Sequence, residues 1–201
     1  MKLAPTAGYA IALLLVGAAL ALALLDDRGE QQAVEVVGEG CQDGSPAGRL
    51  RPYSLGDAFE GLALETVLLG CNGHRGGDTI SYIYGDCEPP VGVEGGCAAP
   101  LQVQVWRACA RTYRDYSPGN RSPLSRRRGV PVMKGERQIE VYADSTVVIF
   151  AESHGLAERA LAALRPMPRG GDPAHVSAEP KPRRDLPRPP PGALEKTLRC
   201  S

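Results

Sequence analysis

A single apolar run near the N-terminus constrains this chain more than any other feature. Residues Tyr9–Leu25 read YAIALLLVGAALALALL and contain no charged side chain. Lys2 precedes the run, and Asp26 and Asp27 follow it, a balance that favours the N-terminus inside and the remainder outside a membrane. As a helix begun at Leu3, the run would measure roughly 34 Å, enough to cross ~30 Å of hydrocarbon. The sequence therefore predicts a signal-anchor helix.

A cleavable signal peptide remains the alternative for the same run. Residues 19–23 (ALALA) offer the small-x-small pattern that a signal peptidase requires. In both cases the rest of the chain lies outside the membrane. We therefore expect either a single-pass protein of the cell membrane with its C-terminal domain outside or, after cleavage, a secreted protein.

The chain falls into four stretches of different composition. Residues 1–25 are the signal-anchor or signal peptide, and residues 26–48 form a polar, Gly-containing juxtamembrane linker. Residues 49–168 carry most of the regular apolar patterning and predict one extracytoplasmic domain. Residues 169–201 begin as a Pro/Arg-rich arm that is too poor in apolar residues to fold alone, yet they end with Leu194, Leu198 and Cys200. We expect the end of this arm to dock back on the domain.

Alternating and β-branched stretches predict the strands of this domain. Leu101–Arg107 (LQVQVWR) is the clearest, because Leu101, Val103 and Val105 fall on one face. Further strands are expected at residues 79–85, 130–133, 138–142 and 146–151, whereas residues 62–69 mix helix and strand formers.

One stretch predicts a helix, and it completes the expected fold class. Residues 156–164 have apolar side chains at helical spacing, with Ser153 as the N-cap and Pro166 as the stop. The sequence thus predicts an α+β fold: an N-terminal transmembrane helix, a small antiparallel sheet of about four or five strands with one or two packed helices, disulfide staples and an extended C-terminal arm.

Six cysteines are expected to be oxidised outside the membrane, where disulfides persist. Cys87 and Cys97 bracket a Pro/Gly-rich turn between two strands, so we pair them. Cys200 needs a distant partner, and Cys109, directly after the clearest strand, is the first choice. Cys41 and Cys71 remain as the third pair.

The sequence contains few residues in patterns typical of catalytic or metal-binding sites. Cys71 and His74 form a C-x-x-H pair, but no second pair of ligands is spaced to complete a zinc site, so neither metal nor cofactor is expected. His74, close to Asp78 and Asp86 in sequence, is the best-placed residue for acid–base chemistry, although no nucleophile can be assigned to it.

Charge is distributed unevenly along a chain that is neutral overall. Residues 26–100 have 13 acidic and 4 basic side chains, and residues 101–201 have 18 basic and 10 acidic ones. The basic stretch contains Arg126, Arg127 and Arg128, which we identify as a candidate site for anionic lipid or wall polymer. A solvated arginine-rich loop is the alternative, and nucleic acid is not expected outside a membrane.

The chain resembles uncharacterised membrane-anchored or secreted proteins of high-GC Gram-positive bacteria. The resemblance covers roughly residues 45–201 and rests on these motifs: IYGDC at 83–87, Gly96-Cys97, PLQVQVW at 100–106, Cys109, RGVP at 128–131 and Cys200. It implies a location and no activity.

Three functional hypotheses remain open from the sequence. The first is a membrane-tethered extracytoplasmic binding or structural protein of the cell envelope, without enzymatic activity. The second is an envelope enzyme that uses His74 with a nearby carboxylate. The third is an accessory subunit of a membrane complex, whose protein partners the sequence does not identify.

Overall fold

The computed structural model describes residues 35–39, 50–71, 78–86, 98–113, 123–170, 172–173, 176, 185–195 and 197–200. These residues belong to one unit of the chain, Val34–Ser201. The apolar run Tyr9–Leu25, Cys41, His74 and the pair Cys87–Cys97 lie outside the described residues. Within the described part, none of the helical segments has the length and hydropathy needed to cross a bilayer.

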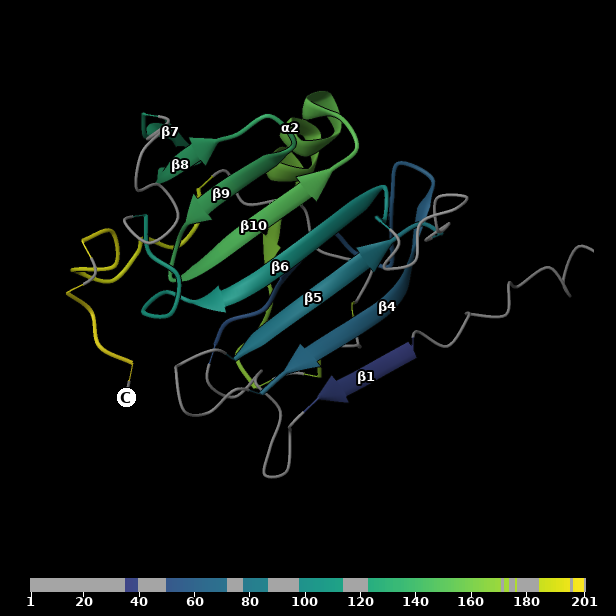
Figure 1. Cartoon of the computed structure of the whole chain (residues 1–201), viewed down its shortest axis with the longest axis horizontal. Coiled ribbons are helices and arrows are strands. Elements are labelled where there is room, and N and C mark those ends of the chain that lie inside the picture. Colours follow the sequence, from purple (N-terminus) through teal and green to yellow (C-terminus); the bar gives the residue numbers. More distant parts are fainter. Residues whose placement is uncertain are drawn as a thin grey trace, which may run out of the picture. The chain divides into compact units, whose positions relative to one another are not determined.

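One twisted sheet dominates the fold (Figure 1), and its strands follow the order β1-β4-β5-β6-β10-β9-β8-β7. Their bounds are β1 Glu35–Glu39, β4 Leu62–Gly70, β5 Thr79–Tyr84, β6 Leu101–Arg107, β10 Ser145–Ala151, β9 Gln138–Tyr142, β8 Val130–Lys134 and β7 Ser125–Arg127. All neighbours on this path are antiparallel except β1 and β4, which are parallel. The short β3 (Ala58–Phe59) adds to β4, and β2 (Tyr53–Ser54) pairs with β11 (Arg165–Pro166) as a second, two-stranded sheet.

The expected fold class is wrong. The described residues are mostly β, with eight strands along the main path instead of four or five, and they contain a single helix and no candidate transmembrane helix. The additional strands lack the alternation that marks a strand in sequence. The edge strand β7, for example, reads Ser-Arg-Arg and has both arginines exposed. Charged side chains are common on edge strands, where they oppose pairing with other chains.

The predicted central strands are confirmed, and their apolar faces form the core. Leu101, Val103 and Val105 of β6 are fully buried, whereas Gln102 and Gln104 between them are partly exposed. Residues 62–69, which the sequence left ambiguous, lie in β4. A register shift between Leu64 and Thr66 breaks the alternation of that strand and explains the ambiguity.

The predicted helix is confirmed as α2, His154–Ala163, which contacts β9 and β10. The side chain of Ser153 accepts a hydrogen bond from the backbone N–H of Leu156 at 3.3 Å, as expected of an N-cap. Leu156, Ala160 and Leu161 are buried in the core, because they recur at helical spacing on the face toward the sheet.

A tight hairpin joins β7 to β8 and also supports the end of α2. Its two loop residues, Arg128 and Gly129, have φ angles of +47° and +78°, the combination that a two-residue type I′ turn requires. The Arg128 guanidinium donates to the carbonyl oxygens of Leu161 at 3.0 Å and Leu164 at 2.5 Å. A cation at this position satisfies the last carbonyls of the helix and complements its dipole.

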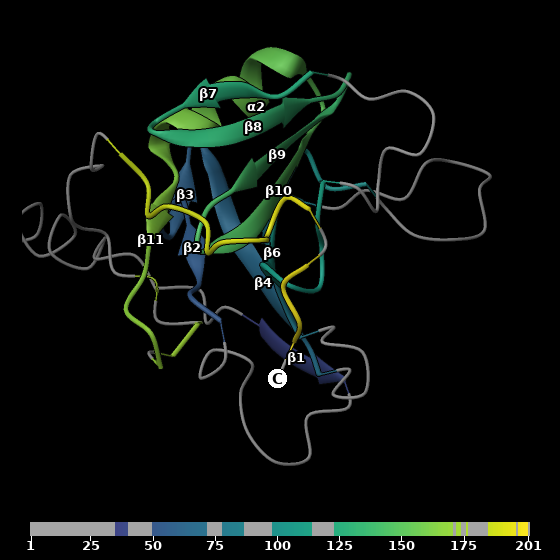
Figure 2. The ribbon, with the colours of Figure 1, turned by 90° about the vertical axis from the view of Figure 1, so that its left-hand side faces the viewer.

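The described part of the C-terminal arm, residues 185–195 and 197–200, packs on the domain (Figure 2). The Leu186 N–H donates to the carbonyl of Arg128 at 2.8 Å, and the Leu186 side chain joins the core. The predicted disulfide between Cys109 and Cys200 is present, with a Cα–Cα distance of 5.3 Å. Cys71 is disulfide-bonded as well.

Candidate anion-binding site

A small cavity of about 200 Å³ lies beside the turn between β9 and β10. It is formed by five segments of the chain: the approach to β2, the end of β6 with the turn after it, the β9–β10 turn, Arg169 after β11, and the C-terminal arm. Its lining residues are Leu50, Arg51, Arg107, Ala108, Cys109, Asp144, Ser145, Arg169, Pro190, Leu198 and Arg199.

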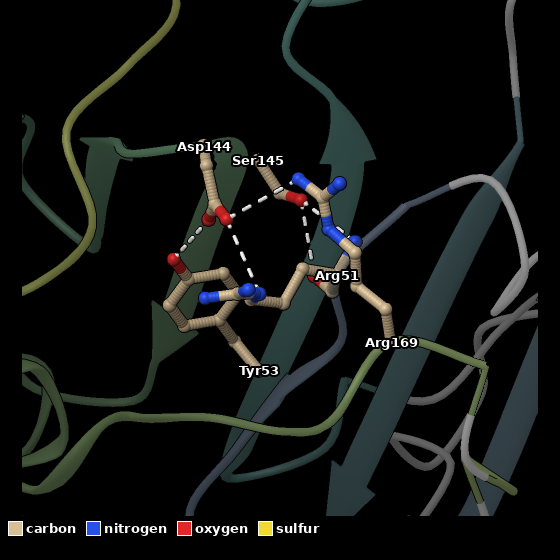
Figure 3. Close-up of polar contacts among 5 residues, drawn as sticks. All are labelled: Arg51, Tyr53, Asp144, Ser145 and Arg169. Carbon is tan, nitrogen blue, oxygen red and sulfur yellow. Dashed lines mark hydrogen bonds and ion pairs between the residues drawn. The ribbon is translucent and has the colours of Figure 1, made fainter.

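Asp144 organises the polar wall of this cavity (Figure 3). Its Oδ1 atom accepts a 2.5 Å hydrogen bond from the Tyr53 hydroxyl. Its Oδ2 atom lies 3.2 Å from Nε of Arg51 and 3.7 Å from Nη2 of Arg169. Burial, with the hydrogen bond and the charge of Asp144 adding to it, raises the pKa of Tyr53, so this phenol remains a donor to the carboxylate.

Arg51 is positioned by its own backbone. The Arg51 N–H donates to the Ser145 hydroxyl at 3.2 Å, and that hydroxyl donates to the Arg51 carbonyl at 3.0 Å. Leu50 and Tyr53, on either side in sequence, are buried. The backbone is therefore fixed on both sides of Arg51. Its buried Nε is paired with Asp144 by charge but has no aligned hydrogen-bond acceptor among the described residues.

Arg107 is the last residue of β6, the turn after it carries Ala108 and Cys109, and buried polar contacts hold this turn in place. Nη2 of Arg111 donates to Oε1 of Glu140 at 2.5 Å, and the side chains of both residues are less than a tenth exposed. The hydroxyl of Thr146 donates to the Arg111 carbonyl at 2.9 Å. These contacts tie the turn to β9 and β10, the same strands whose connection carries Asp144.

The described lining of the cavity has an excess of positive charge. Four of these residues are arginines and one is an aspartate. Asp144 is shared between Arg51 and Arg169, and it also accepts from Tyr53, so a single carboxylate is divided among three donors. A planar guanidinium presents several N–H donors suited to phosphate or carboxylate oxygens, and clustered guanidinium groups attract an anion.

The anion-binding residues predicted from sequence, Arg126–Arg128, lie at the β7–β8 hairpin and make separate contacts; their role in binding an anion stays a prediction. Arg126 and Arg127 are exposed on β7, and their guanidinium groups contact the carbonyls of Gly129 and Arg126. Arg128 instead points to the end of α2. Burial lowers the pKa of Arg128. Arg126 lines an open groove of about 420 Å³, which it shares with Arg188, Leu124 and Leu194 among others.

Carboxylates proposed as partners of His74 are not brought together. Asp78 is buried directly before β5, and Asp86 is exposed after that strand ends. At about 3.3 Å per residue, the six residues of β5 alone place them roughly 20 Å apart. His74 itself lies outside the described residues, so the acid–base hypothesis stays a prediction.

The sequence did not identify Arg51, Asp144, Arg169 or Arg199 as members of one site, and no local motif marks them. Among the described residues, no group of three His, Cys, Asp or Glu side chains is arranged to hold a metal ion. Comparisons with protein-family models, curated proteins and solved structures find no match to this chain.

Proposed function

We propose that this protein is an extracytoplasmic binding protein of the cell envelope that holds a phosphate-bearing ligand in the arginine-lined cavity. The observation that carries the proposal is the convergence of four arginines on one cavity whose described lining has one carboxylate, that of Asp144. The four are Arg51, Arg107, Arg169 and Arg199. At about 200 Å³ the cavity is smaller than the roughly 300–1,000 Å³ of drug-sized sites, so it suits one phosphate group of a larger molecule.

Cellular location is inferred from the cysteines and the N-terminal run. Cys109 is joined to Cys200, and Cys71 is also in a disulfide, which is the state expected in an oxidising compartment. The run Tyr9–Leu25, whether it acts as a signal or as an anchor, supports export. Outside a membrane, phosphate groups are carried by lipid headgroups and by phosphodiester polymers of the wall, and both would present the same chemistry to the cavity.

Three probes test this proposal with the oxidised protein: inorganic phosphate, a soluble poly(glycerol phosphate), and vesicles of phosphatidylglycerol compared with phosphatidylcholine. Calorimetry measures the first two and co-sedimentation the third. We expect phosphate to bind, and Arg51→Gln to weaken binding about tenfold or more, because it removes a charge-assisted contact. The stronger binder among polymer and vesicle identifies the source of the phosphate group.

A matched control separates this cavity from the site predicted by sequence. The double variant Arg126→Gln/Arg127→Gln removes two exposed charges from β7 and leaves the cavity intact. We expect it to change binding less than twofold. Loss of binding in this variant with retention in Arg51→Gln would place the site on β7, and no binding of any probe by the wild-type protein would refute the proposal.

A further inference from the structure

The wall of the arginine-lined cavity contains a disulfide that also holds part of the binding surface in place. Cys109 lines the cavity from the turn after β6, and Leu198 and Arg199 line it from the C-terminal segment. Cys200, the residue after Arg199, is bonded to Cys109. The bond therefore joins the two sides of the same small cavity.

Residues 197–200 are connected to the rest of the arm by local hydrogen bonds. The Thr197 N–H and hydroxyl both donate to the carbonyl of Gly192, at 3.3 and 3.5 Å. Arg199 is exposed and Leu198 is only partly buried. These features contrast with Leu186 and Ala193, which are buried and hold the preceding part of the arm on the domain.

We propose that the Cys109–Cys200 disulfide is a redox-controlled closure of this phosphate site. While the bond is intact, Arg199 stands beside Arg51, Arg107 and Arg169. When it is reduced, the segment from Leu198 onward is released and takes Arg199 out of the site. This inference rests on the proposed function, since it concerns the regulation of the same cavity.

The reducing step is a thiol–disulfide exchange with an external dithiol. A thiolate of the dithiol attacks one sulfur of the pair, the Cys109–Cys200 bond breaks, and a mixed disulfide forms. The second thiol of the reductant resolves this intermediate. Two electrons and two protons thereby pass to the cysteines, which become thiols, while the dithiol becomes a disulfide. Both cysteines are partly exposed, so the bond is within reach of a reductant.

The experiment compares phosphate binding by the oxidised and the reduced protein. We expect dithiothreitol to weaken binding of inorganic phosphate by about tenfold, the effect of losing one charge-assisted hydrogen bond. Arg199→Gln, which keeps the disulfide, should bind like the reduced wild-type protein. Arg188→Gln is the matched control, because it removes an arginine of the same arm that lines the other groove. It should retain the binding and the redox response.

Because dithiothreitol also reduces other disulfides, the double variant Cys109→Ser/Cys200→Ser isolates this one. We expect the double variant to bind weakly and equally with and without reductant. If it does not fold, Arg199→Gln measured with and without dithiothreitol decides the question, because a variant that lacks Arg199 should lose no further affinity on reduction. Equal phosphate affinity of the oxidised and reduced wild type, with Arg51→Gln still defective, would refute the closure and leave the site. Absence of binding by the oxidised wild type would refute the site itself.

Discussion

Replacing Arg111 by methionine would leave the carboxylate of Glu140 buried without its cation. Glu140 is fully buried, and its Oε1 atom accepts from Arg111 at 2.5 Å and from Gln138 at 3.4 Å. Removing one partner of a buried ion pair costs about 3–5 kcal/mol, because the remaining charge has been taken out of water. Loss of the contact between the Arg111 guanidinium and the Trp106 ring, 5.6 Å apart, would add roughly 0.5–1 kcal/mol.

Arg111→Met/Glu140→Met should recover about 2 kcal/mol of this loss. The double change removes both charges and leaves the Tyr142 hydroxyl, which donates to Oε2 of Glu140 at 3.0 Å, without that acceptor. An unsatisfied buried hydroxyl costs about 1–3 kcal/mol, so the double variant should be the more stable of the two.

Urea unfolding of the oxidised protein, with both variants and wild type in parallel, measures these differences. For a chain of this size the single variant should also melt roughly 7–24 °C lower, at about 2–4 °C per kcal/mol. Arg126→Met is the matched control, because Arg126 is exposed on β7, and it should change stability by less than about 0.5 kcal/mol. The reasoning fails if Arg111→Met costs less than about 1 kcal/mol, or if the double variant is less stable than the single one.

Two further perturbations test the packing of the sheet and the helix. Burial is the largest cause that raises the pKa of Tyr53, Tyr82, Tyr84 and Tyr142, so the folded state keeps protons that the unfolded state loses above the ordinary value of 10.0. Stability should therefore be fully present below pH 10 and fall as the pH rises further. These four tyrosines should show phenolate absorbance at alkaline pH only when the protein unfolds. Titration of all seven tyrosines in a protein that stays folded would contradict the prediction. For the helix, Ser153→Ala removes the N-cap acceptor of α2 and should cost about 1 kcal/mol in urea unfolding, whereas Ser153→Asp keeps an acceptor and should be close to wild type. Equal losses in both variants would show that the cap does not stabilise the helix.

Local patterns account for the elements that the sequence predicted correctly. The strand Leu101–Arg107 is visible because one face is buried and the other is not, so the side chains alternate. The helix α2 is visible because its cap, its spacing and its stop all lie within the same 14 residues, 153–166. Such signals depend only on the neighbours of each residue along the chain, and the sequence itself fixes these neighbours.

The fold class depended on strands whose formation is decided by pairing. β1 is parallel to β4, β2 pairs with the distant β11, and β7 reads as a charged loop until it is placed beside β8. The partners of β1 and β2 lie far away in sequence, so a local pattern carries little information about these two strands. The partner of β7 is the adjacent β8, but the charged side chains of β7 hide its strand character. A prediction from the sequence alone therefore contains too few strands and overestimates the share of helix.

The amino-acid sequence alone determined the central strands, the helix and the pairing of Cys109 with Cys200. The strands and the helix have a local signal, and the cysteine pairing had a small set of alternatives. The site had no such signal, because Arg51, Arg107, Arg169 and Arg199 are separated by at least 30 positions. Sheet register, the β9–β10 turn and the disulfide bring these four charges to one cavity. Only the tertiary structure could decide this, since like charges repel and gather only where a rigid framework holds them.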